Sequence, residues 1–209
     1  MTRHHHHRTT VDFLGTPITA TVTSTPSVVR RWLRTTAHDF RRHARRLVVG
    51  LGVQWVPDRS HGEDNDAATL QLCVGRRCLL FQLARSAAAP RLLRRFLLHP
   101  DNTFVGIWNH RDRHKLARSR HALGMARDPL DLRTVAVAEG TGEPLHREST
   151  EVIVKECLGY GCGFRFDDRV SRSDWDEEEL SEEQVQQACD DARASFLIGK
   201  DLRAWEFRL

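Results

Sequence analysis

The sequence predicts an α/β fold in which a mixed central β-sheet is flanked by helices. Three observations support this prediction: apolar, strand-like runs fill the first half of the chain, helical segments alternate with strands in the middle, and a long helical segment comes near the end. Such an order is typical of a sheet whose faces are covered by helices. With 209 residues and 40% hydrophobic side chains, the chain is large enough for one domain with its own core.

The first half begins with a hairpin, because the turn residues Gly15 and Pro17 separate two short runs of strand-forming residues. Ser27 is expected to cap a helix whose apolar residues recur at helical spacing. The run 47–56 has the composition of a buried strand. The expected elements of this half are strands over 10–13, 18–22, 47–56, 68–74, 78–83 and 103–108, and helices that begin at Ser27 and Pro90.

The second half is expected to be mostly helical. A helix starts after Asn109, and a last helix starts at Ser181, where Ser181 and Gln184 have the spacing of a capping box. The last helix runs to about Leu202. Between these two, helices are expected over 132–138 and 150–158, and a glycine-rich break over 159–163; the polar stretch 58–66 in the first half is a loop.

Composition excludes some classes of protein. No apolar run reaches the roughly 18 residues that a membrane span requires, so we expect no membrane insertion. The first residues lack the apolar segment of a secretory signal, and an odd count of five cysteines argues against a closed disulfide set. We therefore expect reduced thiols in the nucleus, the cytoplasm or both. A zinc site that adds His146 to the pairs Cys73/Cys78 and Cys157/Cys162 is the alternative, but the pairs lack zinc-ligand spacing.

Three segments are predicted. Residues 1–9 form a disordered, histidine-rich terminus, residues 10–202 form the folded domain, and residues 203–209 form a tail. From Leu202 the tail alternates apolar and charged residues, as an interface strand in a homo-oligomer would. Packing of the tail on its own domain is the alternative.

Basic residues are concentrated in the first two-thirds of the chain, and an acidic block follows at 174–183. A basic face can follow the phosphates of a nucleic acid, because each contact releases condensed counterions. A solvated charged surface explains the same pattern equally well.

Five segments in fixed order carry a resemblance to a known family. They are Val48 to Trp55, Ala68 to Gly75, Phe104 to Gly106, Ser171 to Trp175 and Gln184 to Ala192. In this order they resemble the Werner-type branch of the DEDD 3′-5′ exonucleases, particularly the small plant proteins of that branch. The resemblance implies a three-layer ribonuclease H-like fold.

Enzymes of that family use four acids to hold two Mg²⁺ or Mn²⁺ ions against the scissile phosphate, which is two-metal chemistry. The resemblance places the first-strand Asp-x-Glu pair of the family at Gly52 and Gln54 of this chain. The third acid is Asp112 and the fourth is Asp191, while the tyrosine position one turn earlier is Gln187. Two of the four acids are therefore missing.

We accordingly expect no tightly held metal pair and no bound cofactor, because two carboxylates are too few to offset the dehydration of two divalent cations. The predicted function is that of a pseudo-exonuclease that binds single-stranded nucleic acid through arginines including Arg111, with bases contacting Trp55, His61 or Trp108. Two alternatives stay open: an enzyme that is active through an altered metal site, and an oligomeric scaffold or regulatory module.

Overall fold

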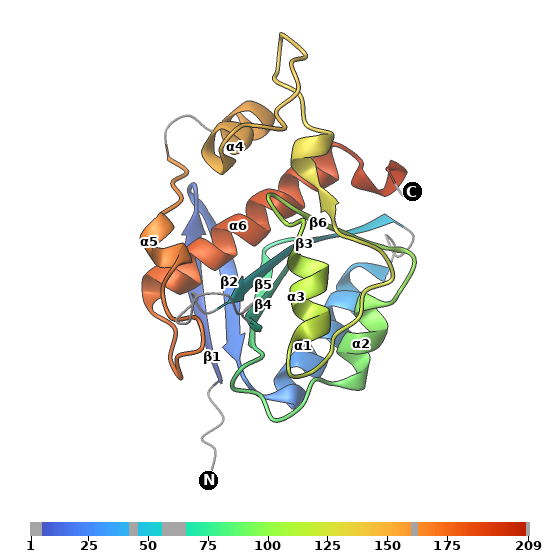
Figure 1. Ribbon diagram of the computed structural model, residues 1–209, viewed down its shortest axis with the longest axis vertical. Helices are drawn as coiled ribbons and strands as arrows, with labels where there is room; N and C mark the ends of the chain where they lie inside the picture. Colours follow the sequence, from blue (N-terminus) through green and yellow to red (C-terminus); the bar gives the residue numbers. More distant parts are fainter. Residues whose placement is uncertain (1–5, 42–45, 56–65, 160–162, 208–209) are drawn as a thin grey trace.

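The computed structural model describes residues 6–41, 46–55, 66–159 and 163–207 (Figure 1). A single sheet runs through the molecule, and helices flank it. The strands are β1 (His6–Phe13), β2 (Thr16–Thr23), β3 (Leu47–Trp55), β4 (Ala67–Val74), β5 (Arg77–Gln82), β6 (Asn102–Gly106) and β7 (Leu130–Asp131). The α-helices are α1 (Pro26–Asp39), α2 (Arg91–Leu97), α3 (Asp112–Arg118), α4 (Thr150–Leu158), α5 (Asp168–Ser171) and α6 (Glu182–Asp201).

Among the described residues, the sheet has seven strands in the order β1-β2-β5-β4-β3-β6-β7. Antiparallel pairing joins β1 to β2 and joins β3, β4 and β5 in succession, whereas β2 pairs with β5, and β6 with β3 and β7, in parallel. The predicted fold class, a mixed sheet flanked by helices, is confirmed.

The long helix α6 crosses the sheet diagonally, and α1, α2 and α3 lie together, away from α6 (Figure 1). The start of α6 has the predicted capping box, in which the Ser181 and Gln184 side chains each accept a hydrogen bond from the other residue's backbone N–H. Close packing of α6 on β3 depends on glycine, since a Cβ at Gly50 would lie 1.9 Å from the carbonyl oxygen of Ala192. Gly199 of α6 similarly allows close packing on the neighbouring strand β6, because a Cβ at Gly199 would lie 2.8 Å from the Val105 side chain.

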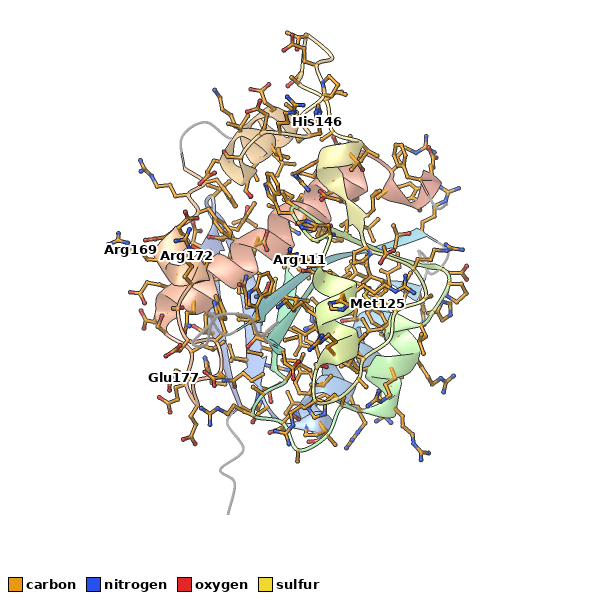
Figure 2. The ribbon with its side chains drawn as sticks, in the orientation of Figure 1. Arg111, Met125, His146, Arg169, Arg172 and Glu177 are labelled. Carbon is orange, nitrogen blue, oxygen red and sulfur yellow. The ribbon has the colours of Figure 1, made fainter. Side chains whose placement is uncertain are left out.

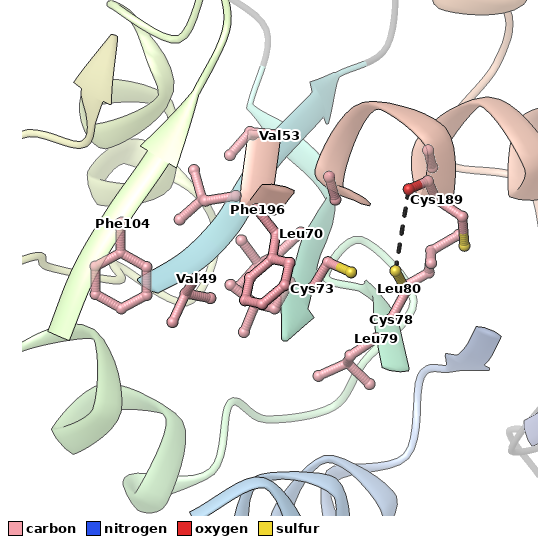
Figure 3. Packing of buried hydrophobic residues seen from close by; sticks show 14 of the residues in the cluster. Val49, Val53, Leu70, Cys73, Cys78, Leu79, Leu80, Phe104, Cys189 and Phe196 are labelled. Atoms are coloured by element: carbon pink, nitrogen blue, oxygen red, sulfur yellow. Dashed lines mark hydrogen bonds between the residues drawn. The ribbon is translucent and has the colours of Figure 1, made fainter. Parts of the chain in front are cut away.

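The core lies on both faces of β3, β4 and β5, and it includes Val49, Val53, Leu70, Phe104 and Phe196 (Figure 3). Three of the cysteines are part of it. Cys73, Cys78 and Cys189 are buried free thiols, and the Cys78 thiol lies 4.0 Å from the carbonyl oxygen of Cys189. They pack as small apolar side chains, as the sequence led us to expect; Cys162 lies outside the described residues.

Several predicted boundaries are wrong. Residues 6–9 belong to β1 rather than to a disordered terminus, since their backbone pairs with β2; residues 1–5 lie outside the described part. Helix α1 begins two residues earlier than predicted, because Thr25 rather than Ser27 is the N-cap and Pro26 fits the first turn, where no backbone N–H is needed. The predicted loop 58–66 and break 159–163 fall largely outside the described residues.

The predicted helix over 132–138 is also wrong. Only Leu132–Thr134 forms a short 3₁₀ turn, and Val137 instead makes a bridge with Pro144 across the turn that Gly140 and Gly142 form at positive φ. The β-branched residues and these glycines favour an extended hairpin over a helix. The short elements β7 and α5 were not predicted.

The C-terminal tail is not an extended strand. Ala204–Glu206 forms a 3₁₀ turn in which Ala204 is buried and Trp205 packs against the core, whereas Phe207 is exposed. The tail therefore packs on its own domain over the residues that the structure describes. Within those residues, no helix is both long and apolar enough to cross a membrane.

Candidate nucleic-acid interface

A cavity of about 490 Å³ opens where the C-terminal end of β3 meets α3 and α6. We call it the Asp112–Asp191 cavity. The start of α4 and the α5 segment form its outer wall, opposite the residues that follow β6. Its lining includes the predicted positions Gly52, Gln54, Trp55, Trp108, Asp112 and Asp191. The structure therefore brings together six of the nine residues that the sequence singled out.

The two predicted carboxyl groups of the cavity, those of Asp112 and Asp191, come from different helices. Asp112 is the first residue of α3 and is buried, and Asp191 lies in the middle of α6 and is half-buried. Burial, the charge of Asp191 and that of Asp131 together hold the pKa of Asp112 well above its usual value. Burial and the charge of Asp190 raise the pKa of Asp191 to about 7. Burial thus shifts both side chains toward the protonated form relative to a solvent-exposed aspartate.

The place of the missing acid at position 52 is occupied by a neighbour. Gly52 pairs with Gln71 of β4, and a Cβ at Gly52 would lie 2.1 Å from Oε1 of Gln71 and 3.1 Å from Oδ2 of Asp191. Gln71 is fully buried, and neither Oε1 nor Nε2 has a described hydrogen-bond partner. An amide thus fills the space that an acidic side chain would need.

Two tryptophans flank the cavity, each beside a cation. The Lys115 ammonium lies 5.0 Å from the centre of the Trp55 ring. The Arg133 guanidinium lies 3.4 Å from the centre of the Trp108 ring and forms a 2.6 Å ion pair with Asp131. Trp108 is 47% exposed and has a φ of 58°, a conformation that costs a non-glycine residue on the order of 1 kcal/mol. The structure keeps a large ring at the mouth of the cavity despite this strain.

Gln187 is buried but does not line this cavity. Its amide bonds to both the N–H and the carbonyl oxygen of Asp167, and it donates to the Ser171 hydroxyl at 2.8 Å, so it ties the α5 segment to α6. Asp190 points away from the cavity as expected and accepts a hydrogen bond from Gln186.

Arg111 does not line the cavity either; it is exposed at the start of α3 (Figure 2). His61 lies outside the described residues. The structure adds Glu151 of α4, Asp168 of α5 and Arg172, which sequence reasoning missed. Arg172 belongs to a segment that carried the family resemblance, but nothing in the spacing of Glu151 or Asp168 indicated this site.

The carboxylates of the cavity do not form a ligand set for a metal pair among the described residues. Within residues 6–41, 46–55, 66–159 and 163–207, no three His, Cys, Asp or Glu side chains converge closely enough to hold a metal ion. Glu151 accepts a hydrogen bond from Phe166 N–H at 3.1 Å, and Asp168 pairs with Arg172 at 3.7 Å. Glu151 is therefore engaged with the backbone, whereas the contact between Asp168 and Arg172 lies on the exposed surface.

Comparison with solved structures identifies the fold. The Aedes aegypti Nibbler EXO domain superposes with a TM-score of 0.63 at 16% identity, over 84% of each chain. The chain has the fold of the ribonuclease H-like exonuclease domains. Escherichia coli RNase D, an exoribonuclease involved in structured RNA processing, superposes with a TM-score of 0.60 at 20% identity, over 80% of this chain and 42% of RNase D.

Brucella melitensis NrnC bound to pGG has a TM-score of 0.53 at 16% identity and covers 77% of this chain and 74% of NrnC. This chain spans less than half of the length of RNase D. No family profile and no curated protein matches the sequence. At identities this low, the structural similarity establishes the fold alone, and the assignment to the plant Werner-type branch stays a prediction.

Proposed function

We propose that this chain binds single-stranded nucleic acid in the Asp112–Asp191 cavity and does not cleave it through a metal pair. A protein of the same fold supplies the precedent for the ligand, since NrnC is bound to pGG. The main support for the absence of metal-dependent cleavage is the position of Gln71, whose amide oxygen occupies the volume of the acid missing at Gly52.

Binding is supported by the chemistry around the cavity mouth. Trp55 and Trp108 offer ring faces on which bases can stack, and base–aromatic stacking is worth about 1 to 3 kcal/mol for each base. Arg172 lines the same cavity with an exposed guanidinium that can contact phosphate. Stacking and phosphate contacts do not require a metal ion.

Loss of cleavage is supported by the donor set. Gly52 supplies no oxygen and Gln54 only a neutral amide, so Asp112 and Asp191 are the acids left from the family's four. Both of them have raised pKa values, and a protonated carboxyl is a poor ligand for a hard cation. An acid restored at position 52 would also have to displace the amide of Gln71.

The binding half is tested by fluorescence anisotropy with a fluorescein-labelled single-stranded oligonucleotide at low ionic strength. Trp108→Ala and Trp55→Ala should each weaken binding about tenfold, and added salt should weaken binding of the unaltered chain. Leu98→Ala is the matched control, because Leu98 is an exposed apolar side chain outside the cavity. Equal affinities for all four proteins would disprove binding in this cavity.

The cleavage half is tested with a 3′-labelled oligonucleotide in Mg²⁺ or Mn²⁺. We expect no shortening of the strand by the unaltered chain. Degradation that Asp112→Ala or Asp191→Ala abolishes would show an active enzyme with an altered site and would overturn the proposal.

A further inference from the structure

A second cavity lies at the opposite end of β3 from the first. It has a volume of about 380 Å³ and is enclosed by the start of β3, the β4–β5 turn, the last turns of α6 and the C-terminal 3₁₀ turn. We call it the Arg193 cavity. It shares no lining residue with the Asp112–Asp191 cavity. Its size falls in the range of small-ligand sites, which run from about 300 to 1,000 Å³.

The central group of this cavity is a buried guanidinium. Arg193 is 8% exposed, and its Nη1 donates to the carbonyl oxygen of Gly75 in the β4–β5 turn. Its Nε is buried and has no partner among the described residues. No Asp or Glu belongs to the described lining of the cavity. Because a buried charge is costly unless an opposite charge accompanies it, an unbalanced guanidinium here indicates a place for an anion.

Three more cations line the same cavity. They are Arg46, Arg76 and Lys200, all exposed at the rim. Four positive charges around 380 Å³ exceed what a single carboxylate would balance and fit a phosphate monoester, which carries nearly two negative charges at neutral pH. Arginine also suits phosphate geometrically, because its fork can bond two phosphate oxygens at once.

Aromatic rings alternate with these cations. Phe40, Phe196 and Trp205 line the cavity, the Arg46 guanidinium lies 5.9 Å from the centre of the Trp205 ring, and that of Arg193 lies 5.4 Å from the centre of the Phe196 ring. Nε1 of Trp205 is a second buried donor that has no described partner. Rings and guanidinium planes together provide stacking surfaces for a flat heterocycle with hydrogen-bond acceptors.

The backbone is shaped to bring these groups together. Gly75 has a φ of +59°, and a Cβ at this position would lie 2.8 Å from Cζ of Phe40. Glycine thus permits both the turn and the close approach of the Phe40 ring, while the Gly75 carbonyl fixes Arg193.

We propose that the Arg193 cavity is a binding site for a nucleoside monophosphate group, with the phosphate held by Arg193, Arg76 and Lys200 and the base placed among the Phe40, Phe196 and Trp205 rings. The group can be a free nucleotide or the phosphorylated end of a strand. The site is separate from the proposed nucleic-acid interface, and either proposal can fail without the other.

Isothermal titration calorimetry with adenosine monophosphate tests the site. The titration is made in a Trp108→Ala background, which reduces binding at the first cavity, and the charge reversals below assign the remaining binding to the Arg193 cavity. Arg76→Glu and Lys200→Glu, both at exposed positions, should each weaken the affinity at least tenfold. Arg30→Glu, an exposed reversal on α1 outside the cavity, is the matched control and should leave the affinity unchanged.

Absence of binding at millimolar nucleotide, or equal losses in all three charge reversals, would overturn the proposal. Inorganic phosphate that binds as tightly as adenosine monophosphate would remove the role of the rings and overturn it too. Nucleotide should also raise the melting temperature of the unaltered chain, a measurement that needs no variant. Competition by a 5′-phosphorylated oligonucleotide would identify a strand end as the source, and failure to compete would identify a free nucleotide.

Discussion

At the scale of single residues, Gly52 and Gln71 form one unit across two strands. Removing a side chain from the floor of a cavity usually leaves a void, but here the longer amide of the paired residue fills it. The amide gains no described hydrogen bond for either polar atom, so packing rather than hydrogen bonding holds it in place. Restoring a metal site therefore requires the Gln71 amide to move or to be replaced.

The triple variant Gly52→Asp, Gln54→Glu, Gln71→Ala should bind Mn²⁺, as measured by calorimetry. The double variant that retains Gln71 should bind at least tenfold more weakly, because the new Cβ would lie 2.1 Å from Oε1 of Gln71. Adding Asp112→Asn to the triple variant should abolish binding and thus assign the ion to this cavity. Equally tight binding by the double and triple variants would contradict this reading.

Asp191 makes stability depend on pH. Its pKa is about 7 in the folded chain against an ordinary value of 3.8, so the folded state binds more protons than the unfolded state between these values. The free energy of unfolding should therefore fall as pH rises from about 4 to about 7. Asp191→Asn should make the fall shallower and stabilise the protein at pH 8 by on the order of 1 kcal/mol, since partial exposure to water limits the effect.

Urea unfolding at pH 5 and pH 8 measures how the free energy of unfolding changes with pH in the unaltered chain and in Asp191→Asn. Asp128→Asn is the control, because Asp128 is an exposed carboxylate whose side chain is 77% accessible. An unchanged slope in Asp191→Asn would show that this carboxyl is not the source of the pH dependence.

At the scale of elements, the contact between α6 and β3 is made by backbone against backbone at Gly50. A methyl group there would lie 1.9 Å from Ala192 O and 2.9 Å from Phe196 N, and neither atom can rotate away. The helix would have to lift from the strand.

Gly50→Ala should consequently lower the free energy of unfolding by about 3 kcal/mol or more, as seen in thermal or urea denaturation. Gly124→Ala is the matched control, because the nearest atom to its new Cβ is Leu98 Cδ2 at 3.8 Å, and the change should stay within about 0.5 kcal/mol. A tolerated alanine at position 50 would mean that α6 does not lie this close.

The elements also show which sequence signals were sufficient. The strands β3, β4 and β5 were predictable because their apolar runs are unbroken, and α6 because Ser181 and Gln184 mark its start. The segment after β7 was mispredicted because Leu132, Val135 and Ala136 mimic helical spacing while distant pairing with Pro144 decides its shape. Short elements such as α5 carry too few residues for a periodic signal.

The site was predictable only where family resemblance assigned positions. Gly52, Asp112 and Asp191 come from three distant segments, and the sheet and α6 place them in one cavity as expected. The role of Gln71 depends on strand register, and the place of Glu151 depends on how α4 packs. Local sequence contains neither kind of information.

At the scale of the whole molecule, the C-terminal residues belong to the domain. Ending the chain after Arg203 removes the buried Ala204 and the partly buried Trp205, so it should lower the melting temperature by several degrees. Light scattering should give the same number of subunits for the 209-residue chain and for the shortened chain. A loss of subunits on truncation would instead make the tail an interface, and the predicted homo-oligomer would then depend on it.

The absence of a side chain at Gly50 also bears on ligand binding, because it fixes the position of α6 between the two cavities. Helix α6 presents Asp191 to one cavity and, two residues later, Arg193 to the other, and its seat on β3 leaves no gap in which to slide. We therefore expect both cavities to be preorganised, so that the protein loses little conformational entropy when a ligand binds. Occupancy on one side of the helix should leave affinity on the other side unchanged, and the two would fill as independent sites.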